Sequence, residues 1–286
     1  MQTLEKNMIA LYGEKGKQWF ADLPQLRMQS QTAYGLSDLR SFKNLSFNDV
    51  LSGFQGQQAI VLKLGLDSDG LKREAMALRA FAGCGVVNVL AEEDGLLLLE
   101  CAVPGVSLNT YFPEKDAAAI TITATLIKQL HKAPIPPDHA FPHIKDWLPA
   151  LDQDWEIPVD IMQKAKQLRD GLLASAPPDV LLHGDLHHDN VLQQGEAWVV
   201  IDPKGVMGDP AYDVTPFIRN PMPALLEEDI AADMIQQRIS YFADLLAVPR
   251  QRVLDWCFVT TVLSWTWALE DGCDTDYYKN LTRVFE

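Results

Sequence analysis

The stretch LLHGDLHHDNVLQQGEAWVVIDPKGVMGDPAYD, residues 181–213, constrains the fold of this chain more than any other. It contains two short aliphatic runs that end in polar residues: the first leads to Asp185, and the second, Ala197–Ile201, ends at Asp202. Such runs, bounded by Gly and Asp, are typical of short buried strands. Because buried strands fix the direction of the residues that follow them, we expect Asp185, Asn190 and Asp202 to converge on one point.

The spacing of these polar residues is H-x-D-x-x-x-x-N, followed by an Asp at the end of a strand. This is the pattern of a kinase catalytic loop, with Gly184 where protein kinases carry Arg. Phosphoryl transfer needs a carboxylate to accept the proton of the attacking hydroxyl, and oxygen ligands that hold Mg²⁺ on the phosphates. Asp185 is therefore the candidate catalytic base, and His183 a candidate support of its loop. Asn190 and Asp202 are the candidate Mg²⁺ ligands.

Two other interpretations of this stretch are open. Its polar residues can simply cap turns between two strands, or they can form the transition-metal centre of a metal-dependent hydrolase. The candidate ligands of such a centre are His183, Asp185, His187, His188 and Asp189. A centre of this kind also needs distant ligands, and the other histidines lie around a Pro-rich connector rather than in a second ligand motif. The kinase interpretation is favoured.

Composition places the chain among ordinary globular proteins, with 286 residues, 48% of them hydrophobic and 22% charged. No apolar run approaches the roughly twenty residues that a membrane span needs, and the first residues do not resemble a signal peptide. The cysteines are scattered, without a C-x-x-C pair, as expected of reduced thiols. We therefore expect a cytoplasmic protein without disulfides or a zinc site.

The net charge of −15 is unevenly distributed: residues up to Ala102 carry −2, and those from Val103 onward carry −13. Such acidity argues against a nucleic acid partner, because affinity for nucleic acid comes from Lys and Arg on phosphates. It is compatible with a cationic small molecule that is drawn to the second half of the chain. Acidic helix faces that keep the protein soluble are the alternative explanation.

The first part of the chain predicts one helix and a β-hairpin. Residues 4–23 have apolar side chains at helical spacing and predict an amphipathic helix. Val50–Leu64 predicts a hairpin that carries only Gly53 and Gly56, so it holds no full glycine-rich phosphate loop. Lys63 lies in its second strand. A lone Lys there can face solvent, but I-V-L-K resembles the strand lysine that holds nucleotide phosphates in kinases.

A further helix is predicted over Leu71–Ala82 and places Glu74 in its first turns. Glu74 is the candidate carboxylate that orients Lys63, although an acidic residue at this position also complements the helix dipole. Two strands are predicted next, Val86–Leu90 and Leu96–Cys101, around an acidic turn.

The pattern changes at Val103-Pro104-Gly105, where Pro and Gly mark a boundary. We expect residues 1–102 to form a small β-rich nucleotide-binding lobe and residues 103–286 a larger helical lobe with the catalytic and acceptor-binding functions. The helices predicted in the second lobe are Ala117–His131, Ile161–Leu173, Leu225–Leu246 and Val253–Glu270. The predicted fold class is α+β, with the chemistry between the lobes.

With these residues assembled, the chain resembles the aminoglycoside phosphotransferase family, and within it the branch of streptomycin kinases and hydroxyurea-type antibiotic resistance kinases. The resemblance lies in LHGDLHHDNVL (182–192), VIDPKG (200–205) and GDPAYDVTPFIRNP (208–221), with supporting matches at 72–78, 97–108 and 263–272. It spans nearly the whole chain. It implies a bilobal protein-kinase-like fold, ATP or GTP as phosphate donor, and a hydroxyl of a small molecule as acceptor.

The resemblance also implies roles that the spacing alone does not supply. The linker residues Glu100, Cys101 and Ala102 would present backbone groups to the base of the nucleotide. Asp213 would brace the catalytic loop. An acidic pair near the C-terminus, Glu270 and Asp271, would receive a cationic acceptor such as streptomycin.

The acceptor is the least defined part of this prediction. Residues 141–156, where an acceptor would be enclosed, carry no recognisable motif, and their acidic residues suit a binding face or a solvated surface equally. The alternatives are a kinase of a housekeeping sugar or amino-alcohol, and a nucleotide-binding pseudokinase. The presence of Lys63, Asp185, Asn190 and Asp202 together argues against a pseudokinase. The choice between ATP and GTP and the oligomeric state do not follow from the sequence.

Overall fold

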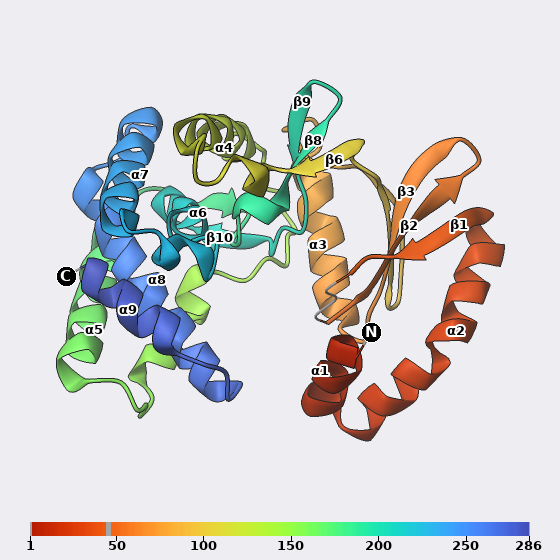
Figure 1. Cartoon of the computed structure of the whole chain (residues 1–286), viewed down its shortest axis with the longest axis horizontal. Coiled ribbons are helices and arrows are strands. Elements are labelled where there is room, and N and C mark those ends of the chain that lie inside the picture. The colour runs from red at the N-terminus through yellow and green to blue at the C-terminus, as the bar shows by residue number, and fades with distance from the viewer. Residues whose placement is uncertain (1, 44–46, 286) are drawn as a thin grey trace.

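The computed structural model describes residues 2–43 and 47–285 (Figure 1). The first part of this described chain forms an antiparallel five-stranded sheet in the order β1-β2-β3-β5-β4. The strands are β1 (Leu36–Ser41), β2 (Asp49–Gln55), β3 (Gln58–Leu64), β4 (Val89–Glu93) and β5 (Leu96–Glu100). The predicted hairpin and the strand predicted over Leu96–Cys101 are confirmed. The strand predicted over Val86–Leu90 was wrong in its bounds, since β4 begins at Val89 and extends to Glu93, and β1 was not predicted.

Two helices precede the sheet, α1 (Gln2–Tyr12) and α2 (Glu14–Tyr34). The prediction of one helix over residues 4–23 was wrong in its bounds. The chain breaks at Gly13, whose φ of 57° lies outside the helical range, and α2 then continues as far as Tyr34. Both helices cover one face of the sheet, in a buried cluster that includes Leu4 and Leu23.

Side chains of β3 alternate between the two faces of the sheet, as the period of a strand requires. Leu62 and Leu64 belong to the cluster with α1 and α2. Val61 packs on the opposite face, in the cluster formed with α3 (Ser68–Ala80), and Lys63 contacts α3 through Glu74. Since α3 stands between the sheet and the helical part (Figure 1), β3 aims Lys63 at the space between the two parts.

The two glycines of the hairpin serve the local geometry of the sheet. Gly56 has a φ of 61°, which the tight turn between β2 and β3 requires. A Cβ on Gly53 would lie 2.7 Å from Cδ2 of Leu39 and 2.8 Å from the carbonyl oxygen of Ser37. The missing side chain therefore lets β1 approach β2 closely.

The second part of the chain is mainly helical. Its helices are α4 (Asp116–Leu130), α5 (Val159–Ala174), α6 (Thr215–Ile218), α7 (Ala231–Leu246), α8 (Arg250–Glu270) and α9 (Asp276–Val284). One small antiparallel sheet has the order β6 (Pro104–Ser107), β8 (Val191–Gln194), β9 (Ala197–Val200), and another pairs β7 (Val180–Leu182) with β10 (Val206–Gly208). The predicted α+β fold with a β-rich first part and a helical second part is confirmed. The boundary at residue 102 stays a prediction.

Two helical segments differ from the sequence-based expectation. The single helix expected over Leu225–Leu246 is a short 3₁₀ turn, Ala224–Glu227, followed by α7, because Glu228 has an extended backbone with ψ of 132°. Helix α9 was not predicted; it packs through Leu281 against the helical core. Within residues 2–43 and 47–285, no helix combines the length and apolarity needed to cross a bilayer.

A fully buried arginine joins three helices of the second part. Arg238 on α7 donates to both carboxylate oxygens of Asp116, at 2.9 and 2.7 Å. It also donates to the backbone carbonyls of Phe217, Ile218 and Asn220 at the end of α6. A buried charge is tolerated only when it is paired and hydrogen-bonded. Arg238 therefore fixes α4, α6 and α7 relative to one another.

We expect Arg238→Met to lower the free energy of unfolding by about 3 kcal/mol, because it leaves a carboxylate and three carbonyls without donors. Urea denaturation measures this loss. The matched control is Arg250→Met, which removes an exposed arginine that bonds Gln236 and Ser240, and should cost less than about 0.5 kcal/mol. Equal losses in the two variants would contradict the structural role of Arg238.

Candidate active site

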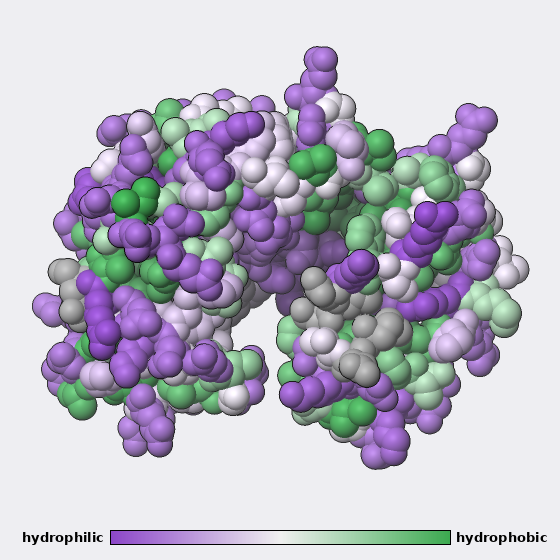
Figure 2. Space-filling model, in the orientation of Figure 1, coloured by the Kyte–Doolittle hydropathy of each residue, from purple (hydrophilic) through white to green (hydrophobic). Residues whose placement is uncertain are grey.

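A cavity of about 940 Å³ lies between the sheet and the helical part, and Figure 2 shows the molecule hollowed between its two halves. Its wall contains every residue predicted to bind the nucleotide or the metal. These residues are Lys63, Glu74, Glu100, Cys101, Ala102, Asn190 and Asp202. Segments from both parts of the fold therefore meet in one cavity, as the sequence pattern predicted.

Lys63 is the centre of a buried ion-pair network in this cavity. Its Nζ lies 2.6 Å from Oε1 of Glu74 on α3 and 2.7 Å from Oδ1 of Asp202, which follows β9. Burial alone would lower the pKa of Lys63, but the charges of Glu74 and Asp202 outweigh it and raise that pKa above its ordinary value. Lys63 is therefore charged at any physiological pH.

Asp202 responds to the same network in the opposite direction. Burial alone would raise the pKa of its carboxyl, but the positive charges of Lys63 and Lys204 outweigh it and hold that pKa well below its usual range. Its backbone has a φ of 59°, in the left-handed region that few residues other than Gly adopt. Asp202 is thus an ionised carboxylate held in an unfavourable backbone conformation, a combination that occurs mostly at functional sites.

Asp213 holds the loop that carries Asp185. Its buried carboxylate accepts hydrogen bonds from the backbone N–H groups of His183 and Gly184, at 2.9 and 2.7 Å, and its Oδ2 lies 3.0 Å from Nε2 of His131. Burial alone would raise the pKa of Asp213, but the hydrogen bond and charge of His131 and the bond from Gly184 lower it overall. The loop therefore closes around an ionised carboxylate.

The ring of His183 links this loop to the strand that leads to Asp202. Its Nδ1 accepts from the N–H of Asp185 at 3.1 Å, so its Nε2 carries the proton and donates to the carbonyl of Ile201 at 2.9 Å. Burial lowers the pKa of His183, which keeps the ring neutral. The predicted supporting position of His183 is thus visible in its contacts, while its functional role stays a prediction.

Asp185 and Asn190 lie on the same loop. The side-chain amide of Asn190 donates to the carbonyl of Asp185 at 2.9 Å, which leaves the amide oxygen for a ligand. The carboxylate of Asp185 is one-third exposed, and its Oδ2 lies 3.9 Å from Nζ of Lys204. Lys204 also lies 3.8 Å from Oδ2 of Asp202. Sequence reasoning did not single out Lys204, although its place two residues after Asp202 in VIDPKG was a usable signal.

The cavity is covered by the connection between β1 and β2, and not by the hairpin glycines Gly53 and Gly56. Phe42, Lys43, Phe47 and Asn48, from the connection between β1 and β2, line the cavity, and neither Gly53 nor Gly56 does. The cavity is therefore lined by the connection that follows β1, a strand that was not predicted, and not by the turn of the predicted hairpin. Residues 44–46 of this connection lie outside the described residues.

The linker between the two parts has its own hydrogen bonds. The N–H of Cys101 donates to the carbonyl of Ala59 at 3.1 Å, so it is not offered to a nucleotide. The carboxylate of Glu100 is held by the side-chain amides of Asn88 and Gln194, at 2.7 and 2.9 Å. For the predicted contact with the base of a nucleotide, the linker therefore offers the carbonyls of Glu100 and Cys101 and the N–H of Ala102.

Glu270 and Asp271 lie outside the wall of this cavity. Both are exposed at the end of α8, one turn beyond Trp267. The ring of Trp267 meets that of Trp147 edge-on, with 6.0 Å between centroids, and Cη2 of Trp147 lies 3.6 Å from where a Cβ on Gly184 would stand. A pair of aromatic rings thus separates the acidic pair from the catalytic loop. Trp265, by contrast, is buried in the helical core.

The histidines near the loop do not assemble a metal centre. His188 is buried and stacks on Phe217, with 3.8 Å between ring centroids, and Nδ1 of His187 accepts from the N–H of Asp189. Burial lowers the pKa of His188 well below its usual value. Among residues 2–43 and 47–285, no group of three or more His, Cys, Asp or Glu side chains is arranged to hold a metal ion.

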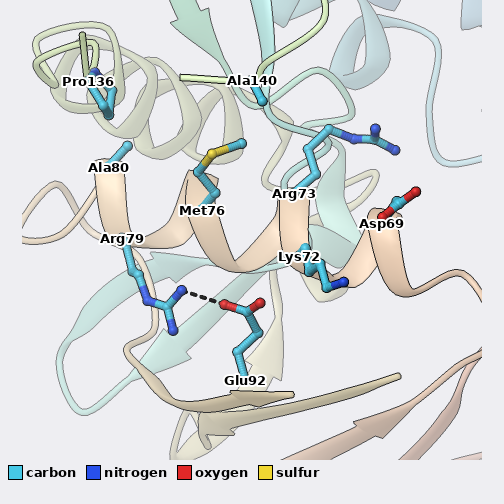
Figure 3. Close-up of a pocket in the computed structure, with 9 residues that line it drawn as sticks. All are labelled: Asp69, Lys72, Arg73, Met76, Arg79, Ala80, Glu92, Pro136 and Ala140. Atoms are coloured by element: carbon cyan, nitrogen blue, oxygen red, sulfur yellow. Dashed lines mark hydrogen bonds and ion pairs between the residues drawn. The ribbon is translucent and has the colours of Figure 1, made fainter. Parts of the chain in front are cut away.

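A second cavity lies on the outer face of α3 (Figure 3). Lys72, Arg73 and Arg79 line it, together with Pro136 and Ala140 of the connector after α4. The guanidinium of Arg79 pairs with Glu92 at 2.6 Å across this cavity. None of the predicted site residues lies in its wall, so the chemistry belongs to the cavity around Lys63.

The fold and the site together define a class of protein: a phosphotransferase of the kinase-like fold that acts on a hydroxyl group. The sequence model of the aminoglycoside/hydroxyurea antibiotic resistance kinases matches residues 47–272, and the chain belongs to this family. The predicted family and enzyme class are confirmed. The interpretations as a metal-dependent hydrolase and as a pseudokinase are not supported.

Similar proteins agree with this assignment. The streptomycin 6-kinase of Streptomyces griseus is 28% identical over 274 residues, which cover 91% of this chain and 87% of that protein. The hydroxyurea phosphotransferase of Kitasatospora aureofaciens is 29% identical over 220 residues, 74% of this chain and 62% of its own. A thermostable mutant of aminoglycoside phosphotransferase APH(4)-Ia, solved with ADP and hygromycin B, has a TM-score of 0.68 at 18% identity, over 90% of this chain and 95% of that one. This last likeness shows the fold.

Asp213→Asn tests the support of the loop. Because the pKa of Asp213 is lower in the folded chain than its unfolded value near 3.9, ionised Asp213 stabilises the fold above about pH 4, and this contribution is lost as the pH falls through the folded pKa. We expect the variant to lose about 3 kcal/mol of unfolding free energy at pH 7, and less at pH 3. Urea denaturation at both pH values measures the two losses.

The control is Asp170→Asn, which removes an exposed carboxylate that pairs with Arg169 and should change stability by less than about 0.5 kcal/mol at either pH. A loss at Asp213 that is the same at pH 7 and pH 3 would show that the charge of this carboxylate does not stabilise the loop.

Proposed function

We propose that the protein transfers the γ-phosphate of ATP or GTP, with Mg²⁺, to a hydroxyl of an aminoglycoside such as streptomycin. The observation that carries this proposal is the convergence of Lys63, Asn190 and Asp202 on one cavity, with Asp185 beside them. The names of the relatives support the acceptor class, since three of them are kinases of streptomycin.

The donor set in the cavity fits Mg²⁺. Asp202 is an ionised carboxylate and Asn190 has an amide oxygen that is not used by the loop; both are hard oxygen ligands, and both line the same cavity. When bound, Mg²⁺ would neutralise charge on the donor phosphates. Asn190 precedes β8 and Asp202 follows β9, so the two would hold it from the same end of this antiparallel strand pair, where Val191 pairs with Val200.

Lys63 would hold the donor phosphates from the sheet side. Its charge is secured by Glu74 and Asp202, and its Nζ is fixed at hydrogen-bond distance from both carboxylates. A cation whose position is set before the nucleotide arrives loses little freedom on binding. The linker would receive the base through the carbonyl of Glu100 and the N–H of Ala102, whose residues line the same cavity.

Asp185 would act as the catalytic base. Its partly exposed carboxylate would accept the proton of the acceptor hydroxyl as the hydroxyl oxygen bonds to the γ-phosphorus. The bond between that phosphorus and the oxygen bridging to the β-phosphate breaks in the same transfer, and the nucleoside diphosphate leaves. The hydrogen bonds of His183 and Asn190 to the backbone of Asp185 hold the base in place while this occurs.

The acceptor would lie on the side of the loop where Trp147 and Trp267 stand. A cationic acceptor would be drawn by the negative charge of the second part of the chain, and Glu270 and Asp271 would pair with its guanidinium groups. Trp267, which is half-buried, can add a cation–π contact. Trp265 cannot, because its ring is enclosed in the core.

We expect Asp185→Asn to lower kcat by a factor of about 10² to 10⁴, as the loss of a general base does, with little change in nucleotide affinity. Steady-state kinetics and calorimetry measure these two quantities. The control is Glu196→Gln in the exposed turn between β8 and β9, which should leave kcat unchanged. A variant of Asp185 that keeps most of its activity would remove this residue from the chemistry.

The acceptor is tested with a panel of aminoglycosides, sugars and amines, each with ATP and with GTP. We expect streptomycin to be phosphorylated, with a KM that rises with salt, because screening limits charge attraction to about 8 Å at physiological ionic strength. Glu270→Gln combined with Asp271→Asn should raise that KM and leave the KM of the nucleotide unchanged.

The matched control is the pair Asp233→Asn and Asp244→Asn, which removes the same charge from the exposed face of α7. If no aminoglycoside binds in calorimetry while a neutral metabolite is phosphorylated, the acceptor assignment fails and the kinase chemistry is retained. If nothing on the panel accepts phosphate, the proposed function as a whole is contradicted.

A further inference from the structure

Lys204 is the charged residue at the centre of the site that the proposed mechanism does not use. Its Nζ lies 3.9 Å from Oδ2 of Asp185 and 3.8 Å from Oδ2 of Asp202. These distances are those of ion pairs, but they are longer than hydrogen bonds. The ammonium group therefore lies between the proposed base and a proposed metal ligand without being bound tightly to either.

The backbone of Lys204 is fixed to the catalytic loop. Its N–H donates to the carbonyl of His183 at 2.7 Å, and its Cβ lies 3.2 Å from where a Cβ on Gly184 would stand. Gly205, which follows, has a φ of 60° and packs so closely on Ala77 of α3 that a side chain would not fit. The backbone and Cβ of Lys204 are thus fixed, whereas half of its side chain is exposed in the cavity.

Lys63 and Lys204 differ in how they are held. Lys63 is buried, and its ammonium makes two hydrogen-bonded ion pairs, so it cannot follow a moving group. Lys204 has a side chain that is 49% exposed and makes no contact closer than an ion pair, so it can re-aim its three N–H groups. The fixed ammonium of Lys63 suits the phosphates of the bound nucleotide. The mobile ammonium of Lys204 suits a group whose charge distribution changes during the reaction.

The position of Lys204 coincides with the path of the transferred group. In the proposed mechanism the acceptor oxygen lies at Asp185, and the donor phosphates lie at Lys63 and Asp202. The γ-phosphorus must pass between them, within reach of an ammonium that stands less than 4 Å from both carboxylates. Two carboxylates so close to a phosphoryl group would repel it, and Lys204 is the cation placed to offset them.

We propose that Lys204 is a catalytic residue that donates hydrogen bonds to the non-bridging oxygens of the transferred γ-phosphoryl group and stabilises their charge. This inference rests on the proposed function. The acceptor oxygen bonds to the γ-phosphorus, the bond to the bridging oxygen breaks, and the acceptor proton passes to Asp185. Lys204 keeps its own protons throughout and supplies only charge and hydrogen bonds.

The test compares nucleotides with and without a γ-phosphate. Wild type and Lys204→Met are titrated by calorimetry, with Mg²⁺, against ADP and AMP-PNP and against GDP and GMP-PNP. We expect the variant to bind the diphosphate as wild type does and to lose about tenfold or more in affinity for the triphosphate analogue, the contribution of a charge-assisted hydrogen bond. Its kcat should fall by about 10- to 100-fold, and Lys204→Arg should restore part of the triphosphate affinity.

The matched control is Lys72→Met on the outer face of α3. The Lys72 side chain is also 49% exposed and makes an ion pair with Asp94 at 3.3 Å, but Lys72 lines the second cavity rather than the site. It should leave all four affinities unchanged. Melting temperatures of the variants within a few degrees of wild type would show that each is folded.

The outcomes separate the inference from the function on which it rests. If wild type binds the nucleotides and Lys204→Met changes diphosphate and triphosphate affinity equally, or changes neither, Lys204 does not contact the γ-phosphoryl group and the inference is overturned alone. If wild type binds none of the four nucleotides, the proposed function fails and the inference fails with it. A loss confined to the triphosphate analogues, absent in Lys72→Met, supports the inference.

Discussion

The rest of the site depends on the buried contact of Lys63 with Glu74 and Asp202. These three residues come from the sheet, from α3 and from the end of β9, and the two ion pairs bring them within 2.6 and 2.7 Å. A buried charge without a partner is energetically unfavourable, so movement of any one of the three segments would leave a charge unpaired. The network therefore sets the distance between the two parts of the fold, and with it the width of the cavity.

A second set of buried contacts holds the catalytic loop inside the helical part. Asp213 closes the loop through its backbone, and the neutral ring of His183 connects the loop to the strand that carries Asp202. The loop that carries Asp185 and Asn190 and the strand that leads to Asp202 are thus held together by these contacts. Against this rigid frame, the half-exposed Lys204 is a charged group of the site that keeps freedom to move.

The proposed acceptor side is built differently from the proposed nucleotide side. The nucleotide cavity is walled by strands and by the loop between them, whereas Trp147, Trp267 and the acidic pair belong to an irregular segment and a helix end. Strands and braced loops leave a readable pattern of alternation and spacing in a sequence. An irregular segment leaves no such pattern, which is why no binding motif is recognisable in residues 141–156.

The sequence by itself determined the features that depend on near neighbours in the chain. The spacing from His183 to Asn190 places the proposed base and one proposed metal ligand on a single loop, and the two-residue period of a strand puts Lys63 on the face of β3 opposite Leu62 and Leu64. Only the tertiary structure decided the contacts that join distant segments. Lys63 meets Asp202 across 139 residues, the connection between β1 and β2 covers the cavity, and Lys204 comes to lie between two carboxylates. Such contacts depend on how whole elements pack, and local pattern does not encode the packing.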